Sequence, residues 1–361
     1  MEIAGDMVGL HATDPASVFL AVWTRGRAQP DAMEAALYDD RTLLRMLGMR
    51  RTMFVVALDL AAVVHSACTK AIAVRERAKL VQILERAGIN RAENWLAHVE
   101  DETIRALAGR GEALASELAE DVPALREQLT FGEGTKWAGR QAVSTRVLFL
   151  LAADARIVRG RPRGSWTSSQ YRWTLVESWL PGGLAESPTD AARVDLVRRW
   201  LATYGPGTIA DLKWWTGLTL GQVRRALDII ETEVVELESG MGLALAGDLD
   251  AAGTEEPWVA LLPALDPTVM GWAERSWYLG DHERALFDRS GNAGPTVWCN
   301  GRIVGGWAQR KDGTVVIHLL EDIGTEARAA IDGQVDQLHR WLGQVRVTPR
   351  FRTPLERQLS T

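Results

Sequence analysis

Apolar residues recur at helical spacing just after the midpoint of the chain, and the spacing then changes to alternation. The run from Leu196 to Leu201 marks one amphipathic helix, which the Gly205-Pro206-Gly207 stretch ends. Thr208 and Thr219 are suitable first residues for two further helices. Alternating segments within residues 234–247, joined at a glycine, predict a β-hairpin. Three helices followed by a hairpin have the element order of a winged helix, a variant of the helix-turn-helix.

The same pattern recurs, with a longer insertion, between residues 102 and 173. Residues 103–129 predict two helices around a glycine-rich break, and residues 141–155 predict a third helix. Residues 156–162 and 169–175 read as the two strands of a wing. This stretch therefore predicts a second winged helix.

A third copy of the pattern is predicted near the start of the chain. Residues 15–25 and 31–47 predict helices, and residues 50–58 predict a strand. A clear first helix is missing from this copy, so either the helix is degenerate or the numbered chain begins late.

After Thr254 the pattern becomes that of a β-structure. Three segments are rich in Val, Ile and Trp, and Asn300-Gly301 is a strong signal for a two-residue hairpin turn. Residues 325–343 then predict an amphipathic helix, followed by a polar tail that contains arginine.

The predicted fold class is α+β: three tandem winged-helix modules and a small β-barrel-like domain in one C-shaped body. We expect five parts: a partial first winged helix with connecting helices (1–95), a second winged helix with a long basic wing (96–180), a third winged helix (190–250), the β-barrel-like domain (255–323), and a C-terminal helix and tail (324–361).

Composition narrows the class of protein. The 361 residues are 47% hydrophobic and 24% charged, as in ordinary globular proteins, and no apolar run is long enough to span a membrane. No secretory signal is evident. Cys68 and Cys299 stand alone, and the six histidines lack metal-ligand spacing. We expect a cytoplasmic monomer without metal or cofactor.

Charge is distributed unevenly along the chain. The formal net charge is -6, yet residues 145–173 hold six arginines against one acid, Asp154. Arginines at wing and third-helix positions favour contact with DNA phosphates, and exposed aromatic residues there favour stacking on bases. The alternative is a solvated basic loop. The residues predicted to contact DNA are Arg50, Arg51, Arg159, Arg161, Arg163, Trp166, Gln170, Arg172, Arg224 and Arg225, and a second candidate hairpin is Asn300, Gly301 and Arg302.

His11 and Thr13 are the candidate catalytic residues. Residues two apart in an extended segment point to one face, so an imidazole and a hydroxyl here are able to hold one water molecule between them. They precede Asp14-Pro15, which predicts a helix N-cap followed by proline at the first helical position. On the residues alone, a loop histidine beside a hydroxyl cap remains the alternative.

Four stretches carry a family resemblance, in order along essentially the whole chain: "VGLHATDPASVFLAVWTR", "LLRMLGMRRTMFVV", "LLPALDPTVMGW" and "VWCNGRIVGGWAQR". They resemble the winged-helix AlkZ-like (YcaQ-like) DNA glycosylases. The resemblance implies three winged helices and a β-barrel that form a basic concave surface around duplex DNA. It also implies excision of bulky N7-alkylguanines, with interstrand-crosslink unhooking in some members and self-protection of antibiotic producers in several.

The resemblance places the catalytic motif of the family, Gln-x-Gln or Gln-x-Asp, at His11-Ala12-Thr13 of this chain. A second family stretch, "RGTLH", has arginine at Arg51 in place of glycine and phenylalanine at Phe54 in place of histidine. Both departures change residue types that the family uses.

The altered motif remains chemically competent. An N7-alkylguanine leaves as a neutral base, so its departure needs no acid, and a positioned water attacks the sugar from the opposite face. A neutral imidazole accepts a proton, and a hydroxyl fixes the water. The sequence thus predicts a monofunctional DNA glycosylase for alkylated, N7-linked purines. The alternative is a winged-helix protein that binds DNA without cleaving it, as a regulator or an adduct binder.

Overall fold

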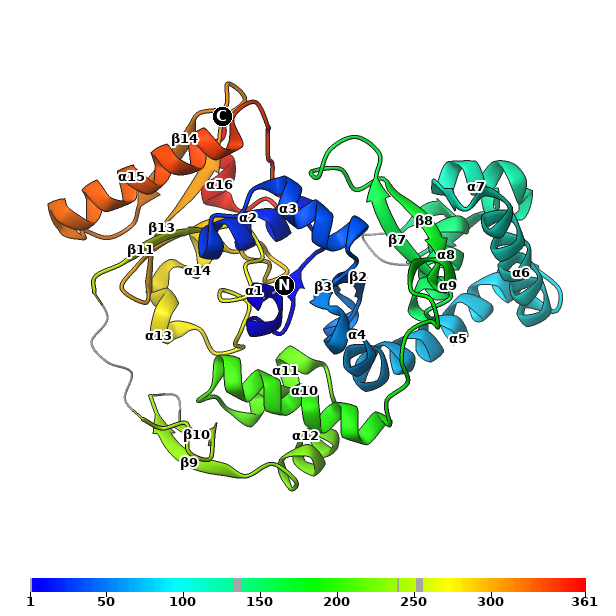
Figure 1. Cartoon of the computed structure of the whole chain (residues 1–361), viewed down its shortest axis with the longest axis horizontal. Helices are drawn as coiled ribbons and strands as arrows, with labels where there is room; N and C mark the ends of the chain where they lie inside the picture. Colours follow the sequence, from blue (N-terminus) through cyan, green and yellow to red (C-terminus); the bar gives the residue numbers. More distant parts are fainter. Residues whose placement is uncertain (1, 133–137, 239, 251–255) are drawn as a thin grey trace. The chain divides into compact units, whose positions relative to one another are not determined.

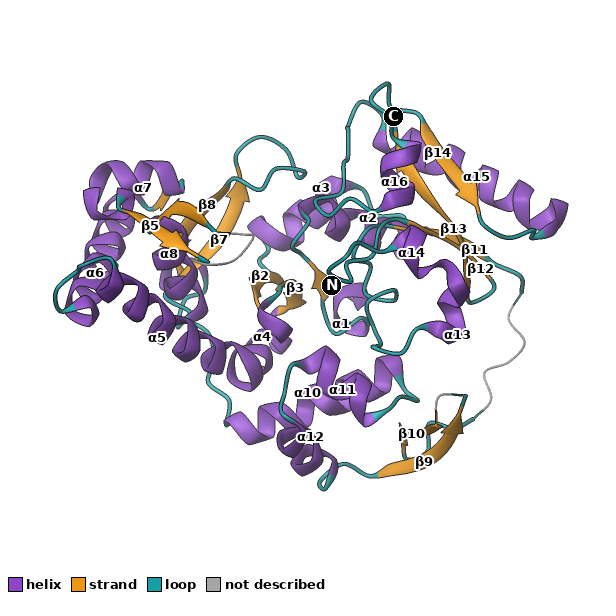
Figure 2. Ribbon diagram, turned by 180° about the vertical axis from the view of Figure 1, so that it is seen from behind, coloured by secondary structure: helices purple, strands orange, loops and turns teal. Residues whose placement is uncertain are grey.

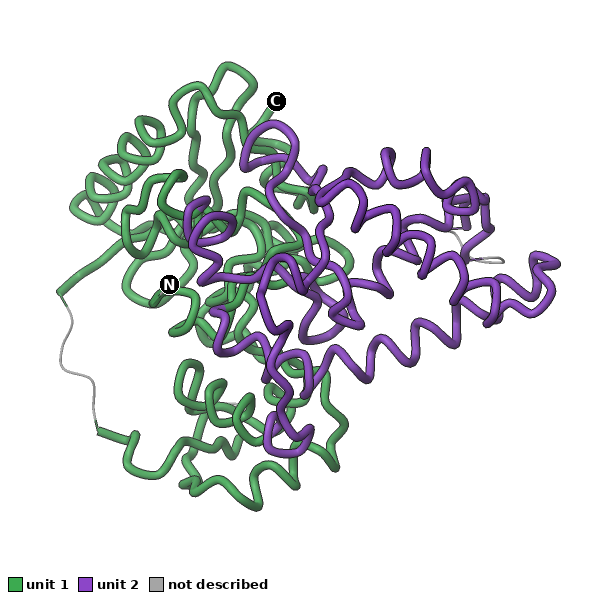
Figure 3. The backbone as a smooth tube through the Cα atoms, turned by 45° about the vertical axis from the view of Figure 1, so that its right-hand side comes forward, with its two compact units in different colours: residues 1–33, 54–56, 194–361 green, residues 34–53, 57–193 purple. Residues whose placement is uncertain are grey.

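The computed structural model describes residues 2–132, 138–238, 240–250 and 256–361. Helices and strands are mixed along the chain, which confirms the predicted α+β class (Figures 1 and 2). Two compact units divide the chain: unit 1 holds residues 1–33, 54–56 and 194–361, and unit 2 holds residues 34–53 and 57–193 (Figure 3). Within the described residues, no helix is both long and apolar enough to cross a membrane.

The winged helix predicted after the midpoint has all of its expected elements. They are α10 (Thr189–Tyr204), α11 (Ile209–Thr216), α12 (Leu220–Leu227), β9 (Thr232–Leu237) and β10 (Gly240–Leu245). Gly207 exchanges two backbone hydrogen bonds with Leu243, at 3.0 and 2.8 Å, and so forms an isolated antiparallel bridge to β10. Ser239, within the predicted hairpin, lies outside the described residues.

Local capping explains why these helices begin where the sequence predicts. The Thr208 hydroxyl accepts a hydrogen bond from the Asp211 amide at 3.1 Å, and the Asp211 carboxylate accepts one from the Thr208 amide at 3.0 Å. Thr219 and Gln222 form the same reciprocal cap on the next helix. Behind them Trp200 is fully buried, and a Cβ atom at Gly207 would lie 2.4 Å from its ring, so this turn requires glycine.

Unit 2 contains the second winged helix. Its elements are α6 (Ala92–Arg110), β4 (Glu112–Ala113), α7 (Ala115–Asp121), α8 (Ser144–Ala153), β7 (Ile157–Pro162) and β8 (Tyr171–Leu175), with strand order β4-β8-β7. The predicted helices and wing strands are therefore present. The sequence did not predict a further hairpin, β5 (Gln128–Phe131) with β6 (Gly139–Ala142), whose connecting residues 133–137 lie outside the described residues.

The N-terminal part contains a strand where the sequence predicts a helix. Residues 43–47, predicted as the end of a helix, form strand β2 (Leu43–Leu47), in which all five side chains are buried. A short apolar run of this kind fits a buried strand as well as a helix, and periodicity alone does not separate the two. The helical conformation ends at Asp39, and Arg41 adopts a left-handed φ of 55° before the strand begins.

The remaining N-terminal and connecting elements are short or irregular. They are α1 (Glu2–Asp6), β1 (Leu10–His11), α2 (Pro15–Gly26), α3 (Pro30–Glu34), a π-helix (Ala35–Asp39), a 3-10 turn (Met49–Arg51), β3 (Met53–Ala57), α4 (Leu58–Val64), a second π-helix (His65–Thr69), α5 (Lys70–Arg86), a second 3-10 turn (Pro123–Arg126) and α9 (Val176–Trp179).

The C-terminal β-structure is an open meander, which corrects the barrel-like domain predicted for residues 255–323. Its strands β11 (Val259–Leu262), β12 (Thr296–Cys299), β13 (Arg302–Gln309) and β14 (Val315–Leu319) pair antiparallel in chain order. Outer strands β11 and β14 do not pair, so no closed barrel exists among the described residues. The Asn300-Gly301 turn has the predicted two-residue form, with φ of 46° and 82°.

Helices cover this sheet instead of further strands. α2 and α15 (Gly324–Leu342) contact β11, while α13 (Ser276–Leu279) and α16 (Pro354–Leu359) contact β13. α14 (Glu283–Leu286) and a 3-10 turn (Gly280–His282) complete the segment. α15 and α16 also contact β14, so helices rather than further strands flank the two outer strands of the sheet. The boundaries and mutual arrangement of the five predicted parts remain predictions.

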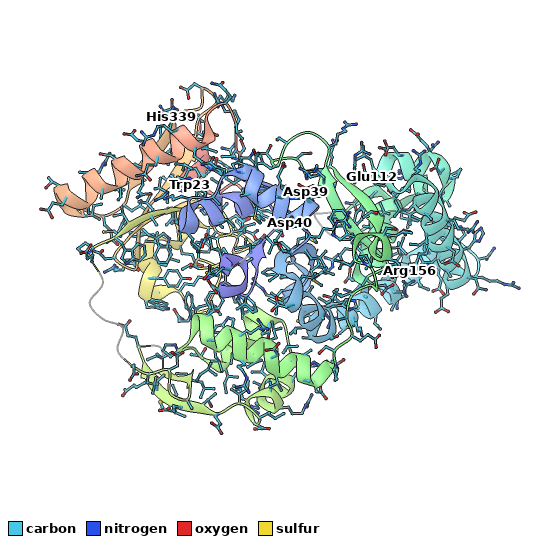
Figure 4. The ribbon with its side chains drawn as sticks, in the orientation of Figure 1. Trp23, Asp39, Asp40, Glu112, Arg156 and His339 are labelled. Atoms are coloured by element: carbon cyan, nitrogen blue, oxygen red, sulfur yellow. The ribbon has the colours of Figure 1, made fainter. Side chains whose placement is uncertain are left out.

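α2 is anchored to this β-structure by a paired charge. The two terminal guanidinium nitrogens of Arg25 donate to the Asp266 carboxylate, at 2.9 and 2.7 Å, and Asp266 is 0% exposed. Burial disfavours the charged guanidinium, but the adjacent carboxylate more than offsets it and raises the pKa of Arg25. Thr24 also donates to the Leu261 carbonyl at 2.9 Å. Trp23 (Figure 4) packs against Trp341 of α15 at a ring distance of 5.5 Å.

We expect Asp266→Ala to lower the free energy of unfolding by about 3 kcal/mol, because it leaves a mostly buried guanidinium without its counter-charge. Asp332→Ala, which removes an exposed pair with Arg328 on α15, is the control and should cost at most about 0.5 kcal/mol. Urea unfolding followed by circular dichroism measures both. Equal losses for the two variants would contradict this account of the anchor.

Candidate active site and nucleic-acid interface

His11 lies in a short buried strand of unit 1. Strand β1 pairs antiparallel with β3, which sets His11 opposite Phe54, and the His11 side chain is 7% exposed. The two rings lie 5.5 Å apart and are tilted by 52°, and the Phe54 ring lies 6.2 Å from Trp215. The imidazole therefore has one aromatic wall and is fixed by strand pairing, where the sequence predicted only an extended approach to a helix.

The chain enters this strand through a left-handed turn. Val8 has a φ of 50° and Gly9 a φ of 109°, directly after α1. A Cβ atom at Gly9 would lie 3.0 Å from a methyl group of Val56 on β3, so both conformation and space favour glycine. A left-handed valine is unusual and costs conformational energy. The turn fixes the direction in which β1 starts and thereby the position of His11.

Thr13 precedes the first turn of α2, as predicted. Asp14 is the buried N-cap: its carboxylate accepts hydrogen bonds from the amides of Ala16 at 3.2 Å and of Arg350 at 3.1 Å. Burial raises the pKa of the Asp14 carboxyl group despite these hydrogen bonds. The exposed Arg350 guanidinium also lies 3.5 Å from the Thr13 carbonyl oxygen. A cation thus stands beside the motif.

The predicted DNA contacts Arg50 and Arg51 form a strained turn in unit 2. Both residues are left-handed, with φ of 54° and 62°, and the Thr52 amide donates to the Met49 carbonyl across them at 3.0 Å. Turns with two positive φ angles normally use Asn-Gly or glycine. Position 51 has glycine in the resembled family. Arg51 therefore adopts a backbone conformation that an arginine disfavours and a glycine does not.

The Arg51 side chain borders an open cavity of about 320 Å³ in unit 2. It forms an ion pair with Glu76 at 2.9 Å, and Lys79 pairs with the same carboxylate. Arg146, a second lining residue, lies 4.5 Å over the Phe131 ring, and burial together with the nearby Arg51 lowers its pKa. Three cations around one carboxylate leave this cavity positively charged.

Several arginines of the predicted basic wing contact groups within the chain. Arg161 pairs with Glu34 at 3.0 Å and with Asp39 at 2.9 Å, and Arg172 lies 3.5 Å from Glu112. Asp39 and Glu112 are both labelled in Figure 4. Arg159 is half-buried over the Trp173 ring, where burial and the nearby Arg45 lower its pKa to about 10. These pairings reduce the positive charge that the wing presents.

The other predicted contacts differ in exposure. Arg163 and Gln170 are exposed in the β7–β8 wing, and their backbones share a hydrogen bond of 2.8 Å. Arg224 and Arg225 are exposed on α12. Trp166 is 7% exposed, so the exposed ring expected for base stacking is not present.

The second candidate hairpin is tied into the sheet. The Asn300 side chain accepts a hydrogen bond from the Trp258 amide at 2.8 Å, and Arg302 lies 3.4 Å from Glu321. Asn300 and Gly301 thus have a clear structural use in the turn. A role for this hairpin in DNA contact stays a prediction.

The structure brings Arg350 next to Thr13 in unit 1, and it gathers Arg51, Arg146 and Lys79 around one cavity in unit 2. Arg350, Arg146 and Lys79 were not among the predicted contacts. Arg350 follows Thr13 by more than 330 positions, and no local pattern signals that approach.

Tandem winged helices with exposed arginines on a third helix define a DNA-binding class of protein. The family model described as "DNA glycosylase AlkZ-like" matches residues 4–341, so the chain belongs to this family. Among solved structures, it is similar to Streptomyces sahachiroi DNA glycosylase AlkZ, with 19% identity and a TM-score of 0.71 over 96% of this chain and 92% of that chain. No curated protein sequence matches the chain.

We expect Arg51→Gly and Arg51→Ala to weaken duplex DNA binding alike, since both remove the charge, and to lower the salt slope of binding by about 1. Their stabilities should differ: the glycine variant relieves the left-handed strain and should be about 1 kcal/mol more stable than the alanine variant. Fluorescence anisotropy at several salt concentrations and urea unfolding measure these two quantities.

Two results would contradict this interpretation of the turn. Parent-like DNA affinity in both variants would show that Arg51 does not contact DNA. Equal stability of the glycine and alanine variants would show that the left-handed backbone stores no strain.

Proposed function

We propose that this protein is a monofunctional DNA glycosylase that hydrolyses the N-glycosidic bond of bulky or alkylated, N7-linked purines in duplex DNA. Such an activity serves DNA repair or self-resistance to a genotoxin. The protein acts as a monomer without a cofactor. His11 and Thr13 position the attacking water.

The observation that supports this proposal most is the fixing of the His11–Thr13 motif at the start of α2. Strand pairing holds His11 against Phe54, and the buried Asp14 cap holds the backbone beside Thr13. A rigid donor and acceptor pair is what a hydrolytic site needs, because orienting the water lowers the entropic part of the barrier. A solvated loop would not provide this.

The chemistry assigns one role to each side chain. A cationic N7-alkylpurine departs as a neutral base, leaving oxocarbenium character on the sugar. His11 accepts a proton from the attacking water, and the Thr13 hydroxyl orients that water by a hydrogen bond. Neither side chain is an amine able to form a Schiff base with the sugar, which fits hydrolysis rather than strand cleavage.

Exposed cations supply the affinity for the duplex. Arg350 lies beside the motif, and in this proposal it contacts a phosphate near the lesion. Arg163, Arg224 and Arg225 are exposed on wing and third-helix positions, where winged helices meet DNA. Contacts of this kind do not depend on base sequence, as expected for a protein that recognises damage.

The second candidate function is DNA binding without cleavage. The observation that favours it is the motif itself, in which histidine and threonine stand where the resembled family has glutamine with glutamine or aspartate. Incubation with duplex DNA containing N7-methylguanine, followed by detection of abasic sites, separates the two. Abasic sites support the glycosylase; tight binding without abasic sites supports the alternative.

We expect His11→Ala to lower single-turnover excision by about 10²-fold, the usual scale for loss of a positioned acid–base group. Thr13→Ala should cost less, because a hydroxyl only orients the water. Neither change removes a charge from a phosphate contact, so duplex affinity should stay unchanged. Parent-like excision by His11→Ala would place the chemistry elsewhere.

The variant His11→Gln restores one family residue and should retain partial activity. The parent enzyme should lose excision on acidification, because a protonated imidazole no longer accepts a proton. The glutamine variant should lack this loss, since its amide does not titrate. Single-turnover rates across a pH series test the difference, and identical profiles would exclude His11 as the base.

We expect Arg350→Gln to weaken duplex binding and to reduce its salt slope by about 1, as for the loss of one phosphate contact. Arg328→Gln is the matched control, because Arg328 is an exposed arginine on α15 in an i,i+4 pair with Asp332. Equal effects of the two substitutions on the salt slope would show a non-specific charge effect. Arg350 would then not be a phosphate contact.

A further inference from the structure

A cavity of about 660 Å³ lies within unit 1, apart from the His11–Thr13 motif. It is bounded by the end of α10, the end of β9 and the segment that leads into α13. Its volume falls within the range of sites for small organic molecules. None of the residues predicted to contact DNA lines it.

Aromatic surfaces form two of its walls. The rings of Trp272 and Trp277 lie 5.2 Å apart and are inclined by 84°, so they make a corner of two nearly perpendicular faces. Trp277 is 50% exposed, an unusual position for a large apolar side chain. A flat molecule that lies on one of these rings meets the other with its edge.

The corner is rigid. The Trp272 indole donates to the Tyr204 carbonyl at 2.9 Å, and the Tyr204 ring packs edge-on against it at 5.3 Å. On its other side, Trp277 meets Tyr278 at a ring distance of 4.8 Å. A preformed aromatic surface binds ligands with little loss of side-chain entropy.

The polar lining carries one sign of charge. The lining residues with ionisable acidic groups are Asp211, Glu238 and Glu274, and no lysine or arginine is among the described residues that line the cavity. Glu274 is held in the ionised form by hydrogen bonds from the Ser276 hydroxyl and amide, at 2.6 and 3.0 Å, which lower its pKa.

The side chains of Asp211 and the adjacent Arg275 already have partners within the chain, which limits what their charges contribute to the cavity. Asp211 is committed to the backbone, since its carboxylate accepts hydrogen bonds from the amides of Ala273 and Glu274 at 2.8 and 3.0 Å, and it contributes charge rather than direct contact. Arg275 is the adjacent cation, but its guanidinium lies over the Trp214 and Phe287 rings, at 4.9 and 4.8 Å.

We propose that this cavity is a binding site for planar organic cations. The π-faces of Trp272 and Trp277 attract a delocalised positive charge, and the surrounding carboxylates balance it. The same lining repels anions, so phosphate-bearing nucleotides and the DNA backbone are excluded from it. The site does not depend on the proposed excision activity, and its test needs no DNA.

The test compares two probes with almost the same ring, N-methylquinolinium and quinoline, in mildly alkaline buffer where quinoline is uncharged. Isothermal titration calorimetry with the full chain measures both. We expect the cation to bind about 5- to 30-fold more tightly, the range for a cation–π contact that is partly removed from water. Equal binding of the two probes, or no binding of the cation, overturns the proposal.

Variants locate the binding. Trp277→Ala and Glu274→Gln should each weaken N-methylquinolinium binding about 5-fold or more. Trp258→Ala is the control, because Trp258 is a similarly exposed tryptophan, 40% exposed, outside the cavity. Circular dichroism checks that each variant is folded. Equal loss in the control, or parent-like affinity in both cavity variants, places the probe elsewhere and overturns the assignment.

Discussion

The buried ion pair between Arg25 and Asp266 is the interaction on which the position of the candidate active site depends. It fixes the C-terminal end of α2 to the segment that follows β11, while the Asp14 cap fixes the N-terminal end through the Arg350 amide. Asp266 and Arg350, which hold the two ends of α2, both come from the last hundred residues of the chain. A buried carboxylate needs either a counter-charge or hydrogen bonds from donors such as amides. Helix α2 has the first at Asp266 and the second at Asp14, so both of its ends are fixed. The His11–Thr13 motif lies directly before this helix, so fixing the helix also fixes the position of the motif.

In the proposed function, catalysis and DNA binding are assigned to different residues. The buried imidazole is shielded by Phe54 and held by strand pairing, which suits chemistry. The cations that suit DNA binding are exposed or held against their backbone preference, as at Arg51. Strain of that kind persists where the surrounding contacts over-determine it, here the Glu76 ion pair and the Phe149 ring. The cavity at Trp272 and Trp277 is lined by acidic residues, so its proposed ligands are cations rather than the phosphates that the exposed arginines contact.

Sequence reasoning succeeded where structure is local. The caps at Asp14, Thr208 and Thr219, the helices of the second and third winged helices and the Asn300-Gly301 turn follow from short-range rules and are present. It failed where long-range packing decides. The buried strand at residues 43–47 has a run that also fits a helix, and the pairing of Arg161 with Asp39 and the approach of Arg350 to Thr13 join distant positions. Trp166 was expected to be exposed, but tertiary packing buries it.

In the proposed function, the His11–Thr13 motif performs the chemistry and does not supply affinity for DNA. The most direct measurement is single-turnover excision of N7-methylguanine by the double variant of His11→Ala and Thr13→Ala, with duplex affinity determined on the same samples. We expect a rate close to that of His11→Ala alone, because groups that hold one water act as a unit, and an affinity equal to that of the parent. A parallel fall in affinity, or a rate equal to that of the parent, would show that the motif does not have this catalytic role.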